Sequence, residues 1–473
     1  MNRHLAARAA GVLAALAVFY LLPDAVLAHQ LNERYEAPLP LAAYVAGAAL
    51  AVAMSFLFVM VRKSPQIPSG QKAAPQIGPV RHAPRWFRYL LQGLGVIAWL
   101  WIVAQTFFGG NGDGDVGTIF LWIYGWVGVA LISGLIGPIW PWLNPFATFH
   151  KILSGIAHRL GIRGGEPAVY PERFRRWPAL IGFVVVVWLE LVFRIEGGQP
   201  LGMFLIAYTF VSVLAMAYFG RDTWLANGET FSVWFELLGR LAPFALEGDP
   251  DEGAIVRRPF ASGLLYAPWT FDELVFIAVA TGSIIFDGLS QTQLYFDVFV
   301  VNAPLGSDPL IRDSITAAIF LGAITLAVLG VARFLTVRAV GAGLLPVAVG
   351  YLVAHYLTYL IIDGQRIILA VNDPLQRGDN LLPGNLGFWS PASPLPTSII
   401  WTIQLAAVVG GHVVGAWAGH SVLTQDESRV AKPVTQRSPL MRQLPLAVLM
   451  VCLTSVTLWS LGQAVIVSAP TTG

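Results

Sequence analysis

Two histidines lie inside long apolar runs of this sequence, where an ionisable side chain is costly unless it faces a partner or a cavity. His355 lies in LVAHYLTYLIIDGQ and His412 in QLAAVVGGHVVGAWAGH. A carboxylate, Asp287, lies in the similarly apolar GSIIFDGLS. Imidazole is the commonest metal-binding side chain and titrates near neutral pH. Together with a carboxylate, these histidines indicate metal ligation or proton transfer.

A structural interpretation of the same histidines stays open. In it, each imidazole bonds to a neighbouring backbone carbonyl or hydroxyl, as buried polar groups commonly do. The sequence has no HExxH, HxH or comparable short motif that would favour a metal. If His355 and His412 are metal ligands, Asp287 or Glu190 could supply a carboxylate. Proton relay and haem ligation are further alternatives.

The N-terminus offers a separate candidate ligand. MNRHLAARAAGVLAALAVFYLLPDAVLAHQ combines a basic start, an apolar stretch and a small residue at Ala28, which is typical of a secretory signal peptide over residues 1–28. Cleavage there would leave His29 as the first residue. Its α-amine and imidazole could then bind one metal, as in copper histidine-brace proteins. Residues 1–28 could instead be an uncleaved first transmembrane helix. Alternatively, cleavage could precede His29 by coincidence, without a metal site.

Transmembrane helices must position these side chains. Of the 473 residues, 56% are hydrophobic and 12% are charged, whereas a soluble domain has about 25% charged residues. We therefore predict an all-α fold, a polytopic transmembrane helix bundle that forms a single domain over residues 29–473. Its ten predicted spans lie near residues 40–61, 89–108, 117–138, 178–195, 201–220, 271–290, 313–335, 343–363, 397–419 and 443–466.

The distribution of Lys and Arg predicts the orientation of the bundle. Twenty-two of these residues lie in loops on one side and five on the other. By the positive-inside rule the richer side is cytoplasmic, which places both mature termini outside. On the outer side, one loop is long enough to cap a cavity mouth. The longer cytoplasmic loops are 62–88, 139–177, 221–270 and 420–442, and the long outer loop is 364–396.

Depth along the helices indicates which polar groups can meet. At about 1.5 Å per residue, His355 falls near mid-membrane and Asp287 in the outer half. The spans that carry His355 and His412 are consecutive and antiparallel, so we expect these two side chains to make contact. The glycines at 410, 411 and 415 would let another helix approach His412 closely.

Three further side-chain and helix placements follow from the pattern. Glu190 and Arg194 are one helical turn apart and are predicted to pair. His420, at the cytoplasmic end of its span, is expected to be solvated. In loop 221–270, ETFSVWFELLGRLAPF has apolar residues at helical spacing, which predicts an interfacial helix.

Composition also excludes several function classes. The net charge is only +2 and no basic patch with interleaved aromatics is apparent, which argues against a nucleic-acid partner. Cys452 is the only cysteine, so one chain cannot form a disulfide framework, a thiolate zinc site or an iron–sulfur cluster. There is no P-loop, GxSxG elbow or GxGxxG motif.

Five segments occur in an order that resembles a known family. They are AHQLNERYEAPLPL, ISGLIGPIWPWLNPF, GSIIFDGLS, AHYLTYLIIDGQ and GHVVGAWAGH. Together they are similar to the bacterial integral membrane proteins labelled fenitrothion hydrolase. The resemblance extends from the start of the predicted mature chain to the ninth span. At one point the chain departs from the family pattern, because Ser421, and not an acidic residue, follows His420.

The resemblance implies a phosphoric triester hydrolase of the bacterial inner membrane, acting on a lipophilic substrate that arrives from the bilayer. The residues would suit this chemistry, since a divalent metal, zinc or copper, held by His355, His412 and a carboxylate could activate water. Asp287 would then be a carboxylate ligand or general base, with Gln365 and Gln404 as orienting donors.

Two rival hypotheses come from other function classes. In one, the chain is a transporter or a metal-handling membrane protein that uses the same histidines. In the other, it is a structural subunit, and a second membrane subunit carries the chemistry.

Overall fold

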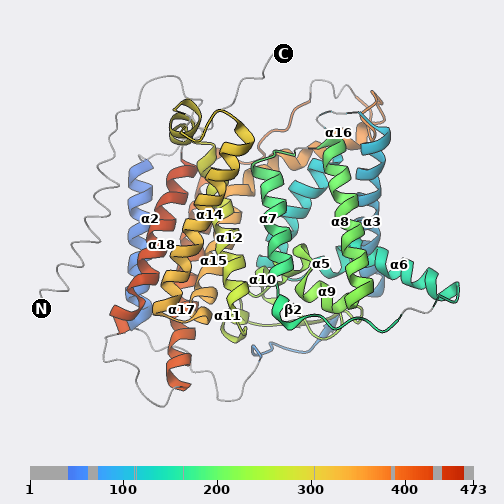
Figure 1. The fold of residues 1–473 in the computed structure, drawn as a ribbon. Coiled ribbons are helices and arrows are strands. Elements are labelled where there is room, and N and C mark those ends of the chain that lie inside the picture. Colours follow the sequence, from blue (N-terminus) through green and yellow to red (C-terminus); the bar gives the residue numbers. More distant parts are fainter. Residues whose placement is uncertain are drawn as a thin grey trace, which may run out of the picture.

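The computed structural model describes residues 41–61, 73–110, 112, 114–162, 165–195, 197–302, 304–384, 389–429 and 439–462. The predicted signal peptide and His29 lie outside these residues. Long helices, most of them roughly parallel or antiparallel to one another, form a bundle (Figure 1). They are α2 (Leu41–Val61), α3 (Arg85–Phe108), η1 with α4 (Thr118–Val129, Ala130–Leu135), α7 (Trp177–Leu191), α8 (Gly198–Phe219), α12 (Phe271–Ser290), α14 (Pro309–Phe334), α15 (Val337–Ile362), α17 (Thr397–Arg429) and α18 (Pro439–Leu461).

Shorter elements connect the long helices. The helical ones are α5 (Trp140–Leu143), α6 (Pro145–Arg159), η2 (Glu172–Phe174), α9 (Arg221–Asn227), α10 (Thr230–Gly239), α11 (Ser262–Tyr266), α13 (Gln293–Tyr295), η3 (Phe296–Val301), η4 (Asp363–Arg366) and α16 (Ile367–Asn372). Three short strands, β1 (Arg81–His82), β2 (Phe244–Leu246) and β3 (Ala254–Arg257), form an antiparallel sheet in the order β1-β3-β2.

The structure confirms the predicted polytopic helical bundle. In the part of the chain that it describes, nine helices are long and apolar enough to cross a membrane. The remaining predicted span, 178–195, corresponds to α7, which has only 15 residues. At about 1.5 Å per residue, α7 is about 22 Å long and falls short of a hydrocarbon core of about 30 Å.

The helices at the centre of the bundle are α12 and α15. In the window of each helix that could span a membrane, 89% and 83% of the residues are buried. Glycines bring α15 and α17 close together, because a Cβ added at Gly411 would lie 2.5 Å from the backbone oxygen of Pro346. Gly415 contacts α15 in the same way, whereas a Cβ at Gly410 would meet no atom within 4 Å. Two of the three predicted glycines therefore create the close helix contact.

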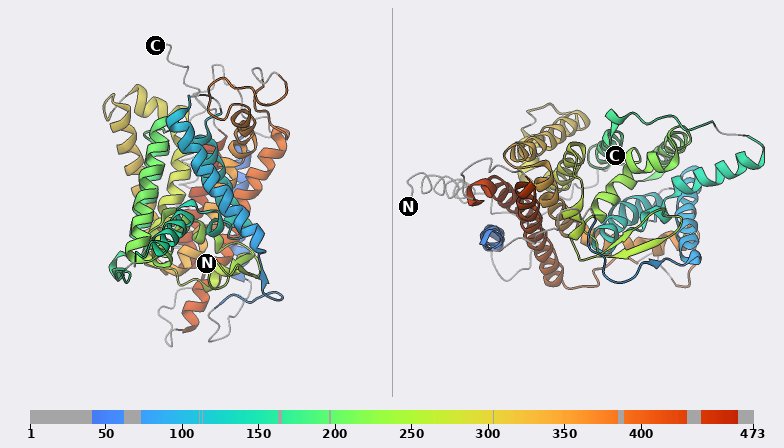
Figure 2. Two further views of the ribbon diagram at one scale, coloured as in Figure 1. Left: turned by 90° about the vertical axis from the view of Figure 1, so that its right-hand side faces the viewer. Right: turned by 90° about the horizontal axis from the view of Figure 1, so that it is seen from below.

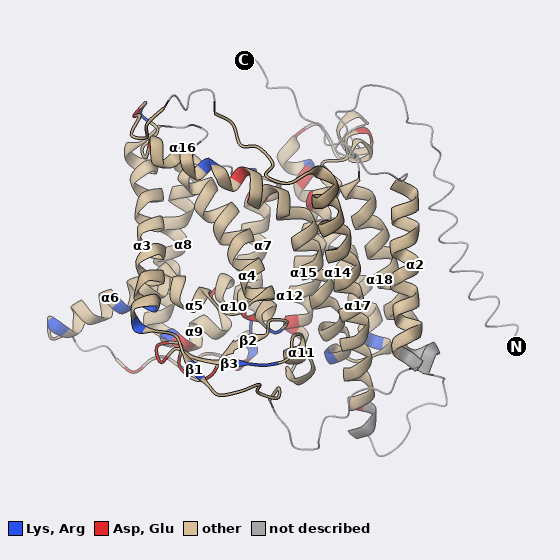
Figure 3. Ribbon diagram, turned by 180° about the vertical axis from the view of Figure 1, so that it is seen from behind, with Lys and Arg blue, Asp and Glu red and all other residues tan. Residues whose placement is uncertain are grey.

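Charge divides the bundle into two ends. In the described part, Lys and Arg gather mostly at the end that carries the sheet, α6, α9 and α11 (Figure 3). We call this the basic end. The opposite end, which we call the far end, carries η4, α16 and the rest of the described part of loop 364–396 (Figure 1).

The helix predicted for ETFSVWFELLGRLAPF is present as α10, but it is not at a membrane interface. Most of its residues are buried, and it packs against α4 and α7 within the protein. The buried carboxylate of Glu229 caps it, accepting hydrogen bonds from the backbone N–H of Phe231 at 3.1 Å and of Ser232 at 2.8 Å. Trp140 and Asn144 also donate to this carboxylate. The prediction of an interfacial position was wrong because protein, and not lipid, covers the apolar side chains of α10.

Candidate functional site

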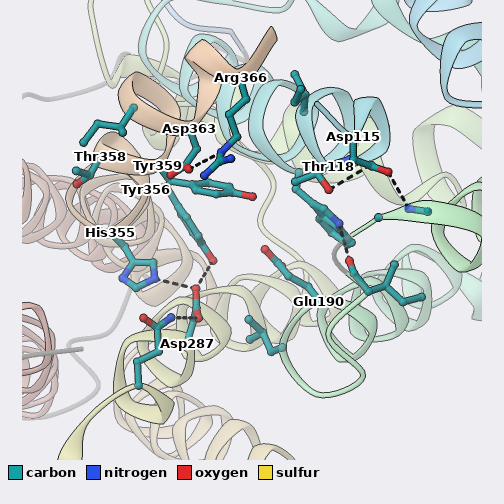
Figure 4. Close-up of a pocket in the computed structure, with 18 of the residues that line it drawn as sticks. Asp115, Thr118, Glu190, Asp287, His355, Tyr356, Thr358, Tyr359, Asp363 and Arg366 are labelled. Atoms are coloured by element: carbon teal, nitrogen blue, oxygen red, sulfur yellow. Dashed lines mark hydrogen bonds and ion pairs between the residues drawn. The ribbon is translucent and has the colours of Figure 1, made fainter. Parts of the chain in front are cut away.

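A cavity of about 1490 Å³ opens between the long helices toward the far end. Its walls come from α3, η1, α7, α8, α12, α15, η4, α17 and α18 and from the loop that precedes η1. Both polar and apolar side chains line it, and Figure 4 shows its acidic and basic residues. They are Asp115, Glu190, Asp287, His355, Asp363 and Arg366.

Asp287 is at the centre of a hydrogen-bonded cluster in the cavity wall. It lies in the last turn of α12, and Gln291 follows one turn later, donating to Asp287 Oδ1 at 2.9 Å. From α15, His355 Nε2 donates to Asp287 Oδ2 at 2.7 Å, and the Tyr356 hydroxyl donates to the same oxygen at 3.0 Å. An ionised carboxylate has about four acceptor positions. Three donors leave one position for water or a ligand.

The packing of α12 against α15 sets the orientation of His355. Its ring lies edge-on to the ring of Tyr356, with centroids 4.6 Å apart at an angle of 85°. On the other side, a Cβ at Gly288 would lie 3.6 Å from His355 Nδ1, so α12 backs the imidazole closely. Because a carboxylate only accepts, the hydrogen bond to Asp287 places a proton on Nε2. The side chains of His355 and Asp287 are each 13% exposed.

Glu190 faces this pair from another wall of the cavity, near the end of α7. Figure 4 shows its side chain pointing toward Asp287. The predicted pairing with Arg194 does not form, because α7 ends at Leu191 and Arg194 takes a left-handed backbone conformation with φ 55°. Arg194 instead lies 3.5 Å from a carboxylate oxygen of Asp313. Among the described residues, Glu190 has neither a hydrogen-bond nor an ion-pair partner.

His412 lies apart from the cavity, fully buried where α15, α17 and α18 meet. Its Nδ1 is 2.8 Å from the backbone oxygen of Val408, and its Nε2 is 2.8 Å from Thr454 Oγ1. The hydroxyl of Tyr351, one turn before His355 on α15, lies 3.3 Å from the same Nε2. Each ring nitrogen of His412 thus has a partner, and His355 is not one of them. This arrangement agrees with the structural interpretation of His412.

His420 is buried, with 6% of its surface exposed, and its Nδ1 is hydrogen-bonded to the Gln443 side chain. The prediction that it is solvated was wrong, because α17 continues to Arg429 and α18 covers this turn.

The two glutamines expected to orient a substrate occupy different places. Gln404 lines the cavity, but its amide donates to the backbone oxygen of Ala354 at 2.6 Å. Gln365 is outside the cavity lining and donates to the backbone oxygens of Ile361 and Ala392, each at 2.7 Å. It joins the end of α15 to the long loop of the far end.

The donors in the cavity do not fit the predicted metal centre. Within the described ranges, no group of three or more His, Cys, Asp or Glu side chains could hold a metal ion. His355 and Asp287 bond directly to each other, and His412 is elsewhere. His29 lies outside the described residues. A divalent metal therefore stays a prediction that must be tested directly.

Polar groups also line the cavity nearer to its mouth. Asp363 and Arg366 pair within η4, with Asp363 Oδ1 3.0 Å from Arg366 Nε. The carboxylate of Asp115 accepts from the backbone N–H of Thr118 and of Gly198, each at 2.9 Å. It thereby caps the N-terminus of η1 and joins it to α8.

Sequence reasoning missed two members of the Asp287 cluster, Tyr356 and Gln291. The i, i+4 spacing of Asp287 and Gln291 was visible in the sequence and is that of a helical polar pair. Whether Tyr356 reaches Asp287 depends on how α15 is rotated about its axis. Its position next to His355 in the sequence does not indicate that rotation.

Comparison with models of protein families, with curated proteins and with solved structures finds no match to this chain. The case for a function therefore depends on the cavity and on the sequence resemblance.

Proposed function

We propose that this chain is a membrane-embedded hydrolase that cleaves a lipophilic ester in the far-end cavity, with organophosphorus triesters of the fenitrothion type as the substrate class. One observation carries the proposal: Asp287, Glu190 and His355 line one cavity between apolar helices. Its volume of about 1490 Å³ is above the usual range of about 300–1,000 Å³ for small-molecule pockets. An aryl triester and a water molecule would fit there together.

In the proposed reaction, a water molecule lies between Asp287 and Glu190. Asp287 holds it through its remaining acceptor position, and Glu190 takes its proton because no other donor engages that carboxylate within the described chain. The water oxygen bonds to phosphorus, and the bond from phosphorus to the aryl oxygen breaks. The aryl oxide leaves without a proton, since a nitrophenolate needs little acid assistance.

His355 acts on this reaction through Asp287. Its Nε2–H, together with the donors of Tyr356 and Gln291, holds the carboxylate in one orientation. Positioning of this kind keeps the water close to the substrate and lowers the entropic part of the barrier.

Nitrophenolate release from fenitrothion by the purified, detergent-solubilised protein tests the proposal. We would run it untreated, after chelation, and after readdition of zinc, cobalt or copper. Release that survives chelation supports the metal-free steps. Release that chelation stops and one metal restores would instead support the predicted divalent metal. No release under any condition would contradict the proposed activity.

Transport is the second candidate, and the placement of the cavity favours it. Ionisable groups within a bundle that opens at one end are typical of a substrate or ion pathway. Flux of the triester or of protons across sealed proteoliposomes, without product formation, would support transport. Product release in detergent, where no gradient exists, would support an enzyme.

We also propose that the basic end faces the cytoplasm of a bacterial inner membrane, with both mature termini outside. The charge division between the two ends of the bundle supports this orientation. If the purified chain neither hydrolyses nor transports the triester, the working hypothesis becomes that a second membrane subunit is required.

A further inference from the structure

Helix α6 extends away from the bundle at the basic end. Figure 1 shows it leaving the side of α3 and α8, and the view from below in Figure 2 shows it extending beyond the other helices. Its first residues, Pro145, Phe146 and Ala147, are buried in the bundle. From Lys151 onward its side chains are mostly exposed. The bundle therefore anchors only the start of this helix.

The exposed part of α6 is amphipathic. Large apolar side chains recur at helical spacing along one face, at Phe149, Ile152, Leu153, Ile156 and just beyond the helix at Leu160. Ile152, Leu153 and Ile156 are 48%, 53% and 48% exposed, and Leu160 is 70% exposed. Beyond Phe149, the side chains of this face stay exposed in the described part of the chain. Exposure of such a stripe to water is unfavourable, because the free energy rises with the apolar surface that water contacts.

The same face turns toward the membrane-spanning part of the protein. Phe149 belongs to the stripe, and its ring packs on that of Trp99, with centroids 4.7 Å apart. Trp99 lies in α3, one of the helices long enough to cross a membrane. The apolar side chains that follow Phe149 on the stripe thus continue from α3 toward the lipid that surrounds the bundle.

The polar face of α6 carries positive charge. Lys151 and Arg159 lie on the helix, which contains no Asp or Glu. Asp251, 3.4 Å from Lys151 Nζ, holds the near part of the polar face against the loop between β2 and β3. Arg159 lies at the far end of the helix. At helical spacing Lys151 lies opposite the stripe, whereas Arg159 lies beside Ile152 at its edge. An apolar stripe with basic residues at its edge and on the opposite face is typical of helices that lie in the headgroup region of an anionic leaflet.

We propose that α6 lies in the membrane interface at the basic end, with its apolar stripe inserted among lipid chains and Arg159 beside anionic headgroups. The ligand is the surrounding bilayer, recognised through its acyl chains and its phosphates. The contact holds the basic end of α3 and α8 at a defined depth. This inference does not depend on the proposed hydrolase activity.

A fluorescent reporter on each face of α6 tests this placement. Cys452 is the only cysteine, so a Cys452→Ser background allows single labels at Ile156→Cys on the stripe and Ser154→Cys on the polar face. Both positions are exposed. Each variant carries an environment-sensitive dye on its single cysteine. It is reconstituted in vesicles of phosphatidylcholine with or without phosphatidylglycerol. Lipids that bear a quencher in the acyl chain are then added stepwise.

We expect emission from position 156 at shorter wavelength than from position 154, and stronger quenching by the labelled lipids. Arg159→Glu should weaken this quenching in the anionic vesicles and change it little in the neutral ones. Water-like emission from both positions would overturn the proposal. A blue shift at position 156 that grows with the amount of protein per vesicle, without quenching by the labelled lipids, would also overturn it. That result would mean that a second copy of the chain covers the stripe.

Discussion

Three donors hold the Asp287 carboxylate in the cavity wall. His355 and Tyr356 come from α15, and Gln291 directly follows α12, at distances between 2.7 and 3.0 Å. A hydrogen bond to a charged group contributes about 1.5–3 kcal/mol. Glu190, in contrast, has no such partner among the described side chains. The two carboxylates therefore suit different tasks, one to hold a water and the other to accept its proton.

Glu190→Gln should lower the rate of ester hydrolysis by about 100-fold or more, since it removes the proposed proton acceptor. The matched control is Arg194→Gln. If Glu190 and Arg194 were paired, both substitutions would disturb the cavity. Because Arg194 lies beside Asp313 instead, its substitution should leave kcat within error of the unchanged protein. Equal losses in the two variants would contradict this assignment.

His412→Ala should destabilise the protein without removing its activity. The substitution removes the buried hydrogen bonds of His412 with Thr454 Oγ1 and with the backbone oxygen of Val408, at a cost of about 1–3 kcal/mol. Thermal unfolding in detergent measures the loss, and the specific activity of the folded fraction gives the second reading. A large loss of activity at unchanged stability would show that His412 takes part in chemistry.

At the scale of elements, the closest contact in the centre of the bundle joins α15 to α17. It depends on the absence of side chains, which allows the two backbones to approach. Buried packing of this kind tolerates added atoms poorly. Because α15 carries His355 and Tyr356, the same contact also holds one wall of the cavity.

Gly411→Ala should destabilise the bundle by about 1–3 kcal/mol, because the added Cβ would lie 2.5 Å from the backbone oxygen of Pro346. Gly410→Ala is the neighbouring control, since a Cβ there meets nothing within 4 Å. Thermal unfolding of the two variants should separate them clearly. Indistinguishable melting temperatures would show that α15 and α17 are not in this close contact.

The basic end contains a pH-sensitive group of ion pairs. Asp251 lies 3.1 Å from Arg221 of α9 and 3.4 Å from Lys151 of α6. Partial burial raises the pKa of Asp251, but Arg221 and Lys151 lower it by more, so the pKa of this carboxyl is below its usual range. Its contribution to stability is therefore complete above the unfolded-state pKa of about 3.9. It is lost as the pH falls through the lowered folded value.

Asp251→Asn should remove this contribution, at most about 1 kcal/mol for partly exposed pairs. The melting temperature of the variant should lie slightly below that of the unchanged protein at neutral pH, and the two should converge as the pH falls toward 3. A difference that grows with acidification would contradict the assignment.

At the scale of the whole molecule, the helices were predictable because the thickness of a bilayer sets the length of each apolar run. Nine predicted spans correspond to helices that meet that length in the described chain. The burial of α10 could not be predicted, since an apolar stripe reads the same whether lipid or protein covers it. The sequence alone predicted that the helix of α7 continues through Arg194. The left-handed backbone conformation of Arg194 is incompatible with that continuation.

The candidate site was only partly predictable for a related reason. Asp287 and His355 were identified because polar groups are costly in apolar runs, and the structure brings them together. The same rule also selected His412, whose nitrogens are bonded within the core. Whether a buried histidine faces a cavity depends on the rotation of its helix and on the side chains of its neighbours. A single sequence carries little of that information.

The most direct test of the account compares His355→Ala with the unchanged protein in nitrophenolate release from fenitrothion. We expect a loss of about 100-fold, because the Asp287 carboxylate is no longer held in position, with membrane insertion and elution in detergent unaltered and partial recovery on addition of imidazole. Gln365→Ala, in η4 directly after the same helix but outside the cavity lining, should keep its activity. Unchanged release by His355→Ala, or no release by the unchanged protein, would contradict the account.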